Sequence, residues 1–179
     1  MKNIIIFSTS MREGSNSEIL AYAFAKGAIE SDNQVEFISL KGKNLNFCQG
    51  CNACDSTGEC AIQDDAAELV NKAETADVLV FAGPMYHTNI SGAMKTLLDR
   101  LTPAMARDYK FTDIYMIITA ADDSEGATKD AEKTLEDWTY SFKRTSIKGI
   151  IRGQGIDSPK EAECHAKVLA TAYQTGREI

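Results

Sequence analysis

Four of the five cysteines lie in one short stretch of the chain, as Cys48, Cys51, Cys54 and Cys60, and Cys164 stands alone near the end. In a reducing compartment such a cluster indicates a metal or redox site rather than a disulfide framework. Tandem C-x2-C runs are typical of [4Fe–4S] ligation, whereas structural zinc generally uses two separated cysteine pairs. The pattern favours a [4Fe–4S] cluster over free thiols or a disulfide, and favours zinc least.

A polar loop, Ser8–Glu18, follows the apolar run Ile4–Phe7. It has neither the G-x-G-x-x-G dinucleotide fingerprint nor the G-x-x-x-x-G-K-[ST] phosphate loop. It offers hydroxyl groups, an amide, an arginine and backbone N–H groups where a helix is expected to begin, and such a place attracts anions. The loop therefore suits a compact phosphate monoester. The alternative is that Ser15 or Ser17 only caps the helix.

The stretch Gly83–Gly92 follows another apolar run and contains Pro84, Tyr86 and His87. Its tyrosine ring and backbone donors could flank a planar group, although simple packing of Tyr86 at a loop edge is the alternative. His87 and Tyr86 are weak candidates for a catalytic role. Lys95 and Asp99 are spaced to form a helix-stabilising i,i+4 pair.

The elements that must position these residues alternate between strand and helix five times. Such alternation predicts a parallel sheet with helices on both faces. Five strands in a chain of this size fit an α/β three-layer, doubly wound sheet of the flavodoxin-like order 2-1-3-4-5, which binds ligands at the carboxyl ends of its strands. The loops that follow strands 1, 3 and 4 are therefore expected to hold the ligand. The expected strands are Asn3–Phe7, Gln34–Leu40, Asp77–Ala82, Asp113–Thr119 and Ser146–Arg152.

The composition is that of a globular protein. The 179 residues suggest a single domain, 1–179, with a cysteine-rich loop at about residues 46–63. The net charge of −7 argues against nucleic acid or an anionic membrane surface as a partner. No N-terminal run is long enough for a signal peptide or a membrane span, so a soluble, cytoplasmic protein is expected. With only two histidines, a hydrolytic triad is not expected.

Three motifs together resemble one known family. Ser8–Glu18 resembles the S-x-S-x-R-x-x-S-N-[ST] phosphate loop of the NAD(P)H-dependent FMN reductases, and Pro84–Arg100 resembles their P-x-Y-x(3)-[IV]-x(4)-K-x(3)-D-R stretch. The cysteine run, followed by Asp64 and Asp65, is similar to the compact motif of the iron–sulfur flavoprotein branch.

The resemblance implies an FMN site and a homodimer or homotetramer. The residues it assigns to FMN are Ser8, Ser10, Arg12, Ser15, Asn16, Ser17, Pro84, Met85, Tyr86, His87, Thr88, Asn89, Thr119 and Ala120. Two features depart from the family. Thr9 and Met11 stand where many relatives have Gly and Pro, and the acidic stretch Thr119–Gly126 lacks their paired glycines. That acidic rim leads to the hypothesis that NADPH, with its extra phosphate, is disfavoured.

The expected function is that of an FMN-dependent oxidoreductase whose chemistry is carried by flavin N5, with no catalytic side chain required. In the iron–sulfur version, a donor such as ferredoxin reduces the cluster, and electrons pass through FMN to a small-molecule acceptor. In the cluster-free version, NAD(P)H reduces FMN, which then reduces a quinone or a free flavin. A non-catalytic electron carrier or a thiol redox sensor is the remaining alternative.

Overall fold

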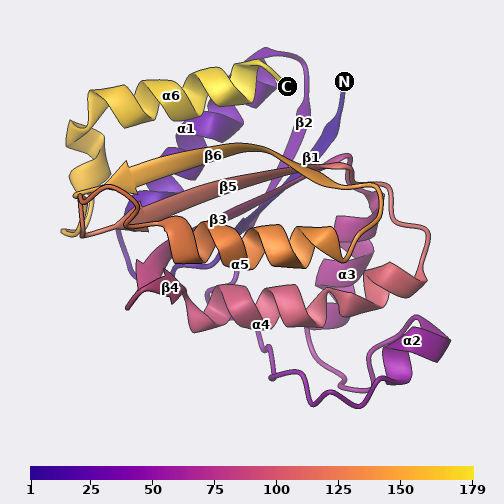
Figure 1. The fold of residues 1–179 in the computed structure, drawn as a ribbon. Helices are drawn as coiled ribbons and strands as arrows, with labels where there is room; N and C mark the ends of the chain where they lie inside the picture. Colours follow the sequence, from indigo (N-terminus) through magenta and orange to yellow (C-terminus); the bar gives the residue numbers. More distant parts are fainter.

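The computed structural model describes residues 1–179, which form a six-stranded sheet between two layers of helices (Figure 1). Five strands are parallel in the order β2-β1-β3-β5-β6, and β4 pairs antiparallel with the end of β3. The strands are β1 (Asn3–Ser8), β2 (Gln34–Ser39), β3 (Val78–Tyr86), β4 (Asn89–Ile90), β5 (Asp113–Ala120) and β6 (Ser146–Gln154).

The predicted topology is confirmed, and the sequence missed one short strand. Strand β3 runs on to Tyr86 instead of ending at Ala82, and Tyr86 pairs with Asn89 of β4. Pro84 sits within β3 at the last position of its parallel ladder with β5, opposite Thr119. A two-residue antiparallel pair carries too little hydrophobic alternation to be recognised in a sequence.

The helices cover both faces of the sheet. Helices α1 (Asn16–Glu30) and α6 (Ala166–Arg177) pack on one face, and α3 (Ala66–Thr75), α4 (Gly92–Arg100) and α5 (Lys129–Tyr140) pack on the other (Figure 1). Helix α2 (Ala53–Thr57) lies in the cysteine-rich loop, which projects from the body of the molecule beyond α3 and α4. Two short 3-10 helices span Thr102–Ala106 and Glu161–Cys164. No helix has the length and apolar character needed to cross a membrane.

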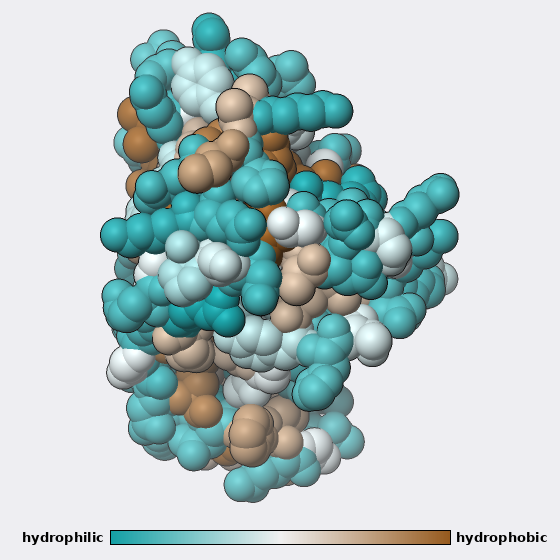
Figure 2. Space-filling model, turned by 90° about the vertical axis from the view of Figure 1, so that its left-hand side faces the viewer, coloured by the Kyte–Doolittle hydropathy of each residue, from teal (hydrophilic) through white to brown (hydrophobic).

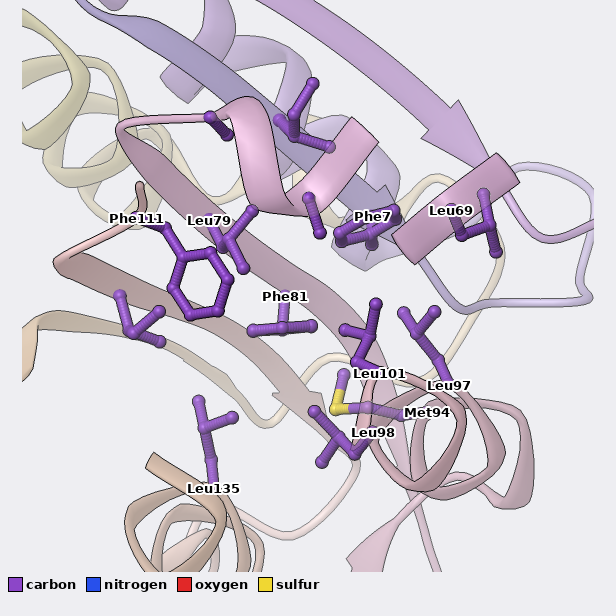
Figure 3. Close-up of a cluster of buried hydrophobic side chains, with 14 of the residues drawn as sticks. Phe7, Leu69, Leu79, Phe81, Met94, Leu97, Leu98, Leu101, Phe111 and Leu135 are labelled. Carbon is purple, nitrogen blue, oxygen red and sulfur yellow. The ribbon is translucent and has the colours of Figure 1, made fainter. Parts of the chain in front are cut away.

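Alternate residues of the central strands supply two separate cores. Ile5 and Phe7 of β1 belong to a cluster of 24 buried residues beneath α3, α4 and α5, in which Phe7 and Phe81 stack with their centroids 5.8 Å apart (Figure 3). Ile4 and Ile6 belong to a cluster of 15 beneath α1 and α6. Because successive strand residues point to opposite faces, an unbroken apolar run marks a strand that is covered on both sides. This burial fixes the positions of the strand ends.

Candidate functional site

The loop after β1 leads into the amino terminus of α1. Ser15 caps the helix, accepting a hydrogen bond from the backbone N–H of Glu18 at 3.4 Å, and its hydroxyl lies 3.0 Å from that of Ser17. Ser10 accepts a hydrogen bond from the backbone N–H of Arg12 at 3.3 Å. Because the first turn of a helix leaves N–H groups without intrahelical acceptors, it offers donors to an anion. The serines are buried beside those donors.

The hairpin formed by β3 and β4 approaches this loop from the neighbouring strand. His87 is the first residue of the two-residue turn and adopts a left-handed conformation, with φ of 55°. The side chains of Tyr86 and His87 make no hydrogen bond within the protein, and Tyr86 is 45% exposed. Neither ring has a partner that would fix it as an acid or base.

One pocket of about 300 Å³ joins the two segments at the carboxyl ends of the strands. This edge of the molecule faces the viewer in Figure 2, where hydrophilic residues predominate and smaller apolar areas lie between them. Among the residues that the sequence assigned to cofactor binding, the pocket is lined by Ser10, Arg12, Ser15, Asn16, Pro84, Met85, Tyr86, His87 and Thr119. Residues from three strand ends therefore converge on one site.

Five of the assigned residues do not line this pocket, namely Ser8, Ser17, Thr88, Asn89 and Ala120. Ser8 donates a hydrogen bond to Glu18 at 2.8 Å, and the Asn89 side chain accepts bonds from the backbone of Ile90 and from the hydroxyl of Thr134. These groups already have partners within the protein. Ser17 is fully buried, and its hydroxyl contacts only that of Ser15.

Three lining residues were not expected from the sequence: Ala121, Ile156 and Asp157. Ile156 and Asp157 follow β6, the edge strand, whose loop was not among the three expected to hold a ligand. The backbone of Ile156 donates to the carbonyl of Ala120 at 3.0 Å, which brings this loop against the end of β5. The signal that could have revealed it is Gly155, a left-handed residue with φ of 67° directly after the strand.

Asn16 connects the loop after β6 to the start of α1. Its side-chain amide donates to the carbonyl of Ser158 at 2.9 Å and accepts from the backbone N–H of Ala162 at 3.0 Å. Arg12 donates to the backbone carbonyl of Asp157 at 2.5 Å, with the Asp157 carboxylate 3.9 Å away. The side chain of Asn16 thus shapes the pocket wall. The backbone N–H of Asn16 is the group available to a ligand.

Thr9 stands where many members of the family that the sequence resembles carry glycine. Its hydroxyl donates to the carbonyl of Ala82 at 3.1 Å, and the side chain is buried against Gly83. A Cβ at Gly83 would come within 2.2 Å of the Thr9 hydroxyl oxygen. The glycine in β3 therefore makes room for the threonine in the loop.

The acidic stretch after β5 lies beside the same pocket. The backbone N–H of Ser124 donates to Asp122 at 2.8 Å, and this bond, together with the Ser124 hydroxyl, holds the pKa of the Asp122 carboxyl below its usual value. The side chain of Gln154 donates to the carbonyl of Ser124 at 3.0 Å, so the stretch is tied to the end of β6. The Asp122 carboxylate therefore stays charged at neutral pH.

A larger open groove, of about 740 Å³, runs between α5 and β6. Charged residues of α5 make up much of its lining, and it reaches Thr145 and Ser146 at the beginning of β6. Because ligands of such sheets bind at the carboxyl ends of strands, the smaller pocket at the strand ends is the better candidate for the functional site.

The four clustered cysteines lie on the projecting loop as free thiols. No three His, Cys, Asp or Glu residues lie close enough together to hold a metal ion. Partial burial raises the pKa of the Cys54 thiol, and the neighbouring Asp55 carboxylate raises it further. An all-thiol donor set on one loop fits an iron–sulfur cluster in its chemistry, and gathering the thiols requires the loop to close.

A buried ion pair holds the base of this loop. Arg100, at the end of α4, donates to both carboxylate oxygens of Asp64 at 2.7 and 2.8 Å, and the two side chains are 1% and 0% exposed. Burial alone raises the pKa of the Asp64 carboxyl, but hydrogen bonds from Arg100, Asn46 and Ala66 hold it well below its ordinary value of 3.8. Nothing in the local sequence predicts this role for Arg100. Lys95 and Asp99 do form the expected pair.

Comparison with known proteins identifies a family and agrees with the fold. The model of the NADPH-dependent FMN reductase family matches residues 2–149. An iron–sulfur flavoprotein of Archaeoglobus fulgidus is 35% identical over 103 residues, covering 58% of this chain and 46% of that protein. One of Methanocaldococcus jannaschii is 37% identical over 100 residues, covering 56% and 52%. These matches thus span about half the length of the curated relatives.

Solved structures show the same fold at low sequence identity. The NAD(P)H:quinone oxidoreductase from Methanothermobacter marburgensis superposes with a TM-score of 0.78 at 17% identity, covering 98% of this chain and 96% of that one. An azoreductase from Bacillus anthracis gives a TM-score of 0.75 at 17% identity, with both chains fully covered.

Proposed function

Because this chain belongs to the NADPH-dependent FMN reductase family, we propose that it is a flavin-dependent oxidoreductase that binds FMN in the pocket at the strand ends. The observation that carries the proposal is the convergence of the α1 amino terminus, the β3–β4 hairpin and the end of β5 on one pocket of about 300 Å³. A helix amino terminus offers donors to a phosphate, and the hairpin offers a wall for a planar ring.

The roles of the residues follow from their positions. Ser10, Arg12 and Ser15, with the backbone N–H groups of the first turn of α1, would hold the phosphate of FMN. The hairpin residues Pro84–His87 would flank the ribityl chain and the ring. FMN, when bound, supplies redox chemistry at N5 of its isoalloxazine. The protein binds and orients the flavin, and no side chain of the pocket is required to form a bond with the substrate.

Three further residues would belong to this proposed site. Ala121, Ile156 and Asp157 line the pocket, and Ile156 is an apolar group that could pack against the flavin. Asp157 lies beside Arg12, so its carboxylate partly neutralises the cation that would face the phosphate. The loop after β6 would therefore moderate how strongly the phosphate is held.

We further propose that Cys48, Cys51, Cys54 and Cys60 hold a [4Fe–4S] cluster that receives electrons from a donor such as ferredoxin and serves a small-molecule acceptor through FMN. The support is the all-thiol donor set on one anchored loop and the similarity to iron–sulfur flavoproteins. Such a cluster supplies one-electron transfer.

The second candidate is a cluster-free reductase in which NAD(P)H reduces FMN. The separation of the thiols in the structure favours this version. We also propose that the chain assembles as a homodimer or homotetramer. Exposed Met11 and Phe47 line an open, largely apolar hollow of about 340 Å³ near the phosphate loop, and a second copy would bury them.

The test is the content of iron, acid-labile sulfide and FMN per chain after anaerobic purification. About four irons with equal sulfide and one FMN per chain are expected for a [4Fe–4S] flavoprotein. FMN without iron, even after attempted reconstitution of the cluster, would support the cluster-free reductase. If no FMN binds even when it is added, the flavin proposal is wrong in both versions.

A further inference from the structure

The carboxylate of Glu18, in the first turn of α1, is bound by residues at the ends of two strands. Its Oε1 accepts a hydrogen bond from the Ser8 hydroxyl at 2.8 Å and a longer one from the Ser39 hydroxyl at 3.5 Å. Its Oε2 accepts from the ammonium group of Lys41 at 3.3 Å. Ser8 ends β1, Ser39 ends β2, and Lys41 follows β2. The Glu18 side chain is only 14% exposed, so these bonds determine where its carboxylate lies.

This arrangement replaces half of a capping box at the start of α1. Ser15 and Glu18 have the S-x-x-E spacing of that motif. In a complete box, the serine hydroxyl accepts from the backbone N–H of the glutamate, and the glutamate carboxylate accepts from the backbone N–H of the serine. The first of these bonds is present at 3.4 Å. The second is not formed, because the Glu18 carboxylate turns to Ser8 and Lys41 instead.

The backbone N–H of Ser15 consequently has no acceptor within the protein. The N–H groups of Asn16 and Ser17 are also free, as the first turn of a helix leaves them. Ser15 is buried and lines the pocket at the strand ends. A complete capping box would occupy one of these donors and would bring a carboxylate to the place proposed for the phosphate of FMN.

We propose that Lys41 is a positioning residue that, together with Ser8, holds the Glu18 carboxylate away from the amino terminus of α1 and so leaves the Ser15 N–H open to a phosphate. This inference rests on the proposed binding of FMN in the pocket. The helix dipole and the free N–H groups attract a carboxylate as well as a phosphate, so Glu18 competes with the ligand unless it is held elsewhere. Lys41 also lies 3.8 Å from Glu13, but that carboxylate is exposed and the pair contributes little.

Lys43 provides a matched control, two residues further along the same connection. Its ammonium group pairs with Glu68 of α3 at 3.2 Å and not with Glu18. The side chains of Lys41 and Lys43 are 26% and 27% exposed. Replacing either lysine by methionine removes one positive charge from a similar environment, but only Lys41→Met releases the Glu18 carboxylate.

The first test compares the binding of FMN with that of riboflavin, which has no phosphate, by fluorescence titration. Lys41→Met is expected to weaken FMN binding by roughly 10-fold, as for the loss of one hydrogen bond to a charged group, and to leave riboflavin binding unchanged. Lys43→Met should change neither. Adding Glu18→Ala to Lys41→Met removes the competing carboxylate and should restore FMN binding relative to riboflavin binding.

Three results of this titration would overturn the proposal. Lys41→Met could leave FMN binding unchanged, or Lys43→Met could weaken it equally. The double variant could also bind FMN as weakly as Lys41→Met does, which would mean that Lys41 acts on the phosphate itself. Because each variant is judged by the ratio of its FMN and riboflavin dissociation constants, general damage to the pocket does not imitate the expected result.

The second test uses the flavin-free full-length protein and follows the backbone amide signal of Ser15 in ¹H–¹⁵N spectra. Lys41→Met is expected to shift this signal, because the released carboxylate reaches the Ser15 N–H. In a Glu18→Ala background the same substitution should leave the signal in place, since no carboxylate is there to move. An unshifted signal in Lys41→Met, or equal shifts in the two backgrounds, would overturn the proposal. If the wild type binds no FMN, the proposed function fails, and this measurement still decides whether Lys41 holds Glu18.

Discussion

Gly27 of α1 and Gly176 of α6 bring the two helices into backbone contact. A Cβ at Gly27 would lie 2.0 Å from the carbonyl oxygen of Tyr173, and one at Gly176 would lie 2.0 Å from that of Phe24. The two helices pack closely on the same face of the sheet. The crossing lies in the last turn of α1, whose first turn is at the candidate pocket, and it holds the helix against α6.

Gly176→Ala should therefore destabilise the protein. The backbone of α1 cannot yield as a flexible side chain could, so we expect a loss of about 1–3 kcal/mol in the free energy of unfolding. Urea denaturation measures it. Gly92→Ala in α4 is the control, because nothing lies within 4 Å of a Cβ built there. An equal loss in the two variants would contradict the contact.

Arg12→Gln tests the phosphate site. Arg12 is half-exposed and shares its charge with Asp157, so we expect FMN binding to weaken by roughly 10-fold, the low end for a hydrogen bond to a charged group. Riboflavin, which has no phosphate, should bind both proteins equally. Flavin fluorescence titration measures both ligands. Equal weakening of FMN and riboflavin would show that Arg12 does not act on the phosphate.

The acidic stretch after β5 should influence the choice of nicotinamide. At low salt we expect NADH to reduce the flavin faster than NADPH does, because Asp122, Asp123 and Glu125 repel the extra phosphate. The double variant Asp123→Asn/Glu125→Gln should raise the NADPH rate relative to the NADH rate by roughly 10-fold. Anaerobic stopped-flow absorbance measures both rates. A faster reaction with NADPH in the wild type at low salt would refute the hypothesis.

His87→Asn tests whether the histidine is an acid catalyst. Asparagine tolerates the left-handed backbone of this turn position, so the hairpin should be retained. Since no partner orients the imidazole, we expect turnover to fall by less than about 10-fold, whereas a general acid contributes roughly 10²–10⁴-fold. Steady-state turnover at saturating substrate measures it. A loss of 100-fold or more would assign proton transfer to His87.

The Asp64–Arg100 pair should make stability depend on pH. The pKa of Asp64 is lowered in the folded protein, so the stabilisation is complete above the unfolded pKa of about 3.9 and is lost as the pH falls towards the folded value. Asp64→Asn should be less stable at neutral pH and should lose less stability between about pH 5 and pH 2. Denaturant unfolding across that range measures it. Parallel pH profiles would mean that Asp64 is not the titrating group.

The sequence predicted the features that depend on local periodicity and on chain order. The apolar runs of β1 and β3 identified buried strands, and the alternation with helices gave the sheet order. That order places the ends of β1, β3 and β5 side by side, so nine of the assigned residues meet at one pocket. In this way Ser10 and Tyr86 could be assigned to the same site although they lie far apart in the chain.

The features that the sequence could not reveal depend on contacts between distant side chains. Arg100 and Asp64 are 36 residues apart, and each resembles an ordinary surface charge until the fold buries both. The Asn16 amide resembled a ligand group, but its bonds to Ser158 and Ala162 connect residues more than 140 positions apart. The partner that such a side chain contacts depends on all the groups that the fold brings close to it. A local sequence pattern does not contain this information.

The anchoring by Arg100 has a consequence for how the cysteine-rich loop relates to the rest of the molecule. Both ends of the loop meet at one guanidinium, and no residue between 46 and 63 belongs to either core cluster. A loop with adjoining ends resembles an Ω-loop, which can vary in length at little cost to the scaffold. The loop is therefore an exchangeable module: a short turn in its place would remove the thiols and leave the sheet and the pocket at the strand ends intact.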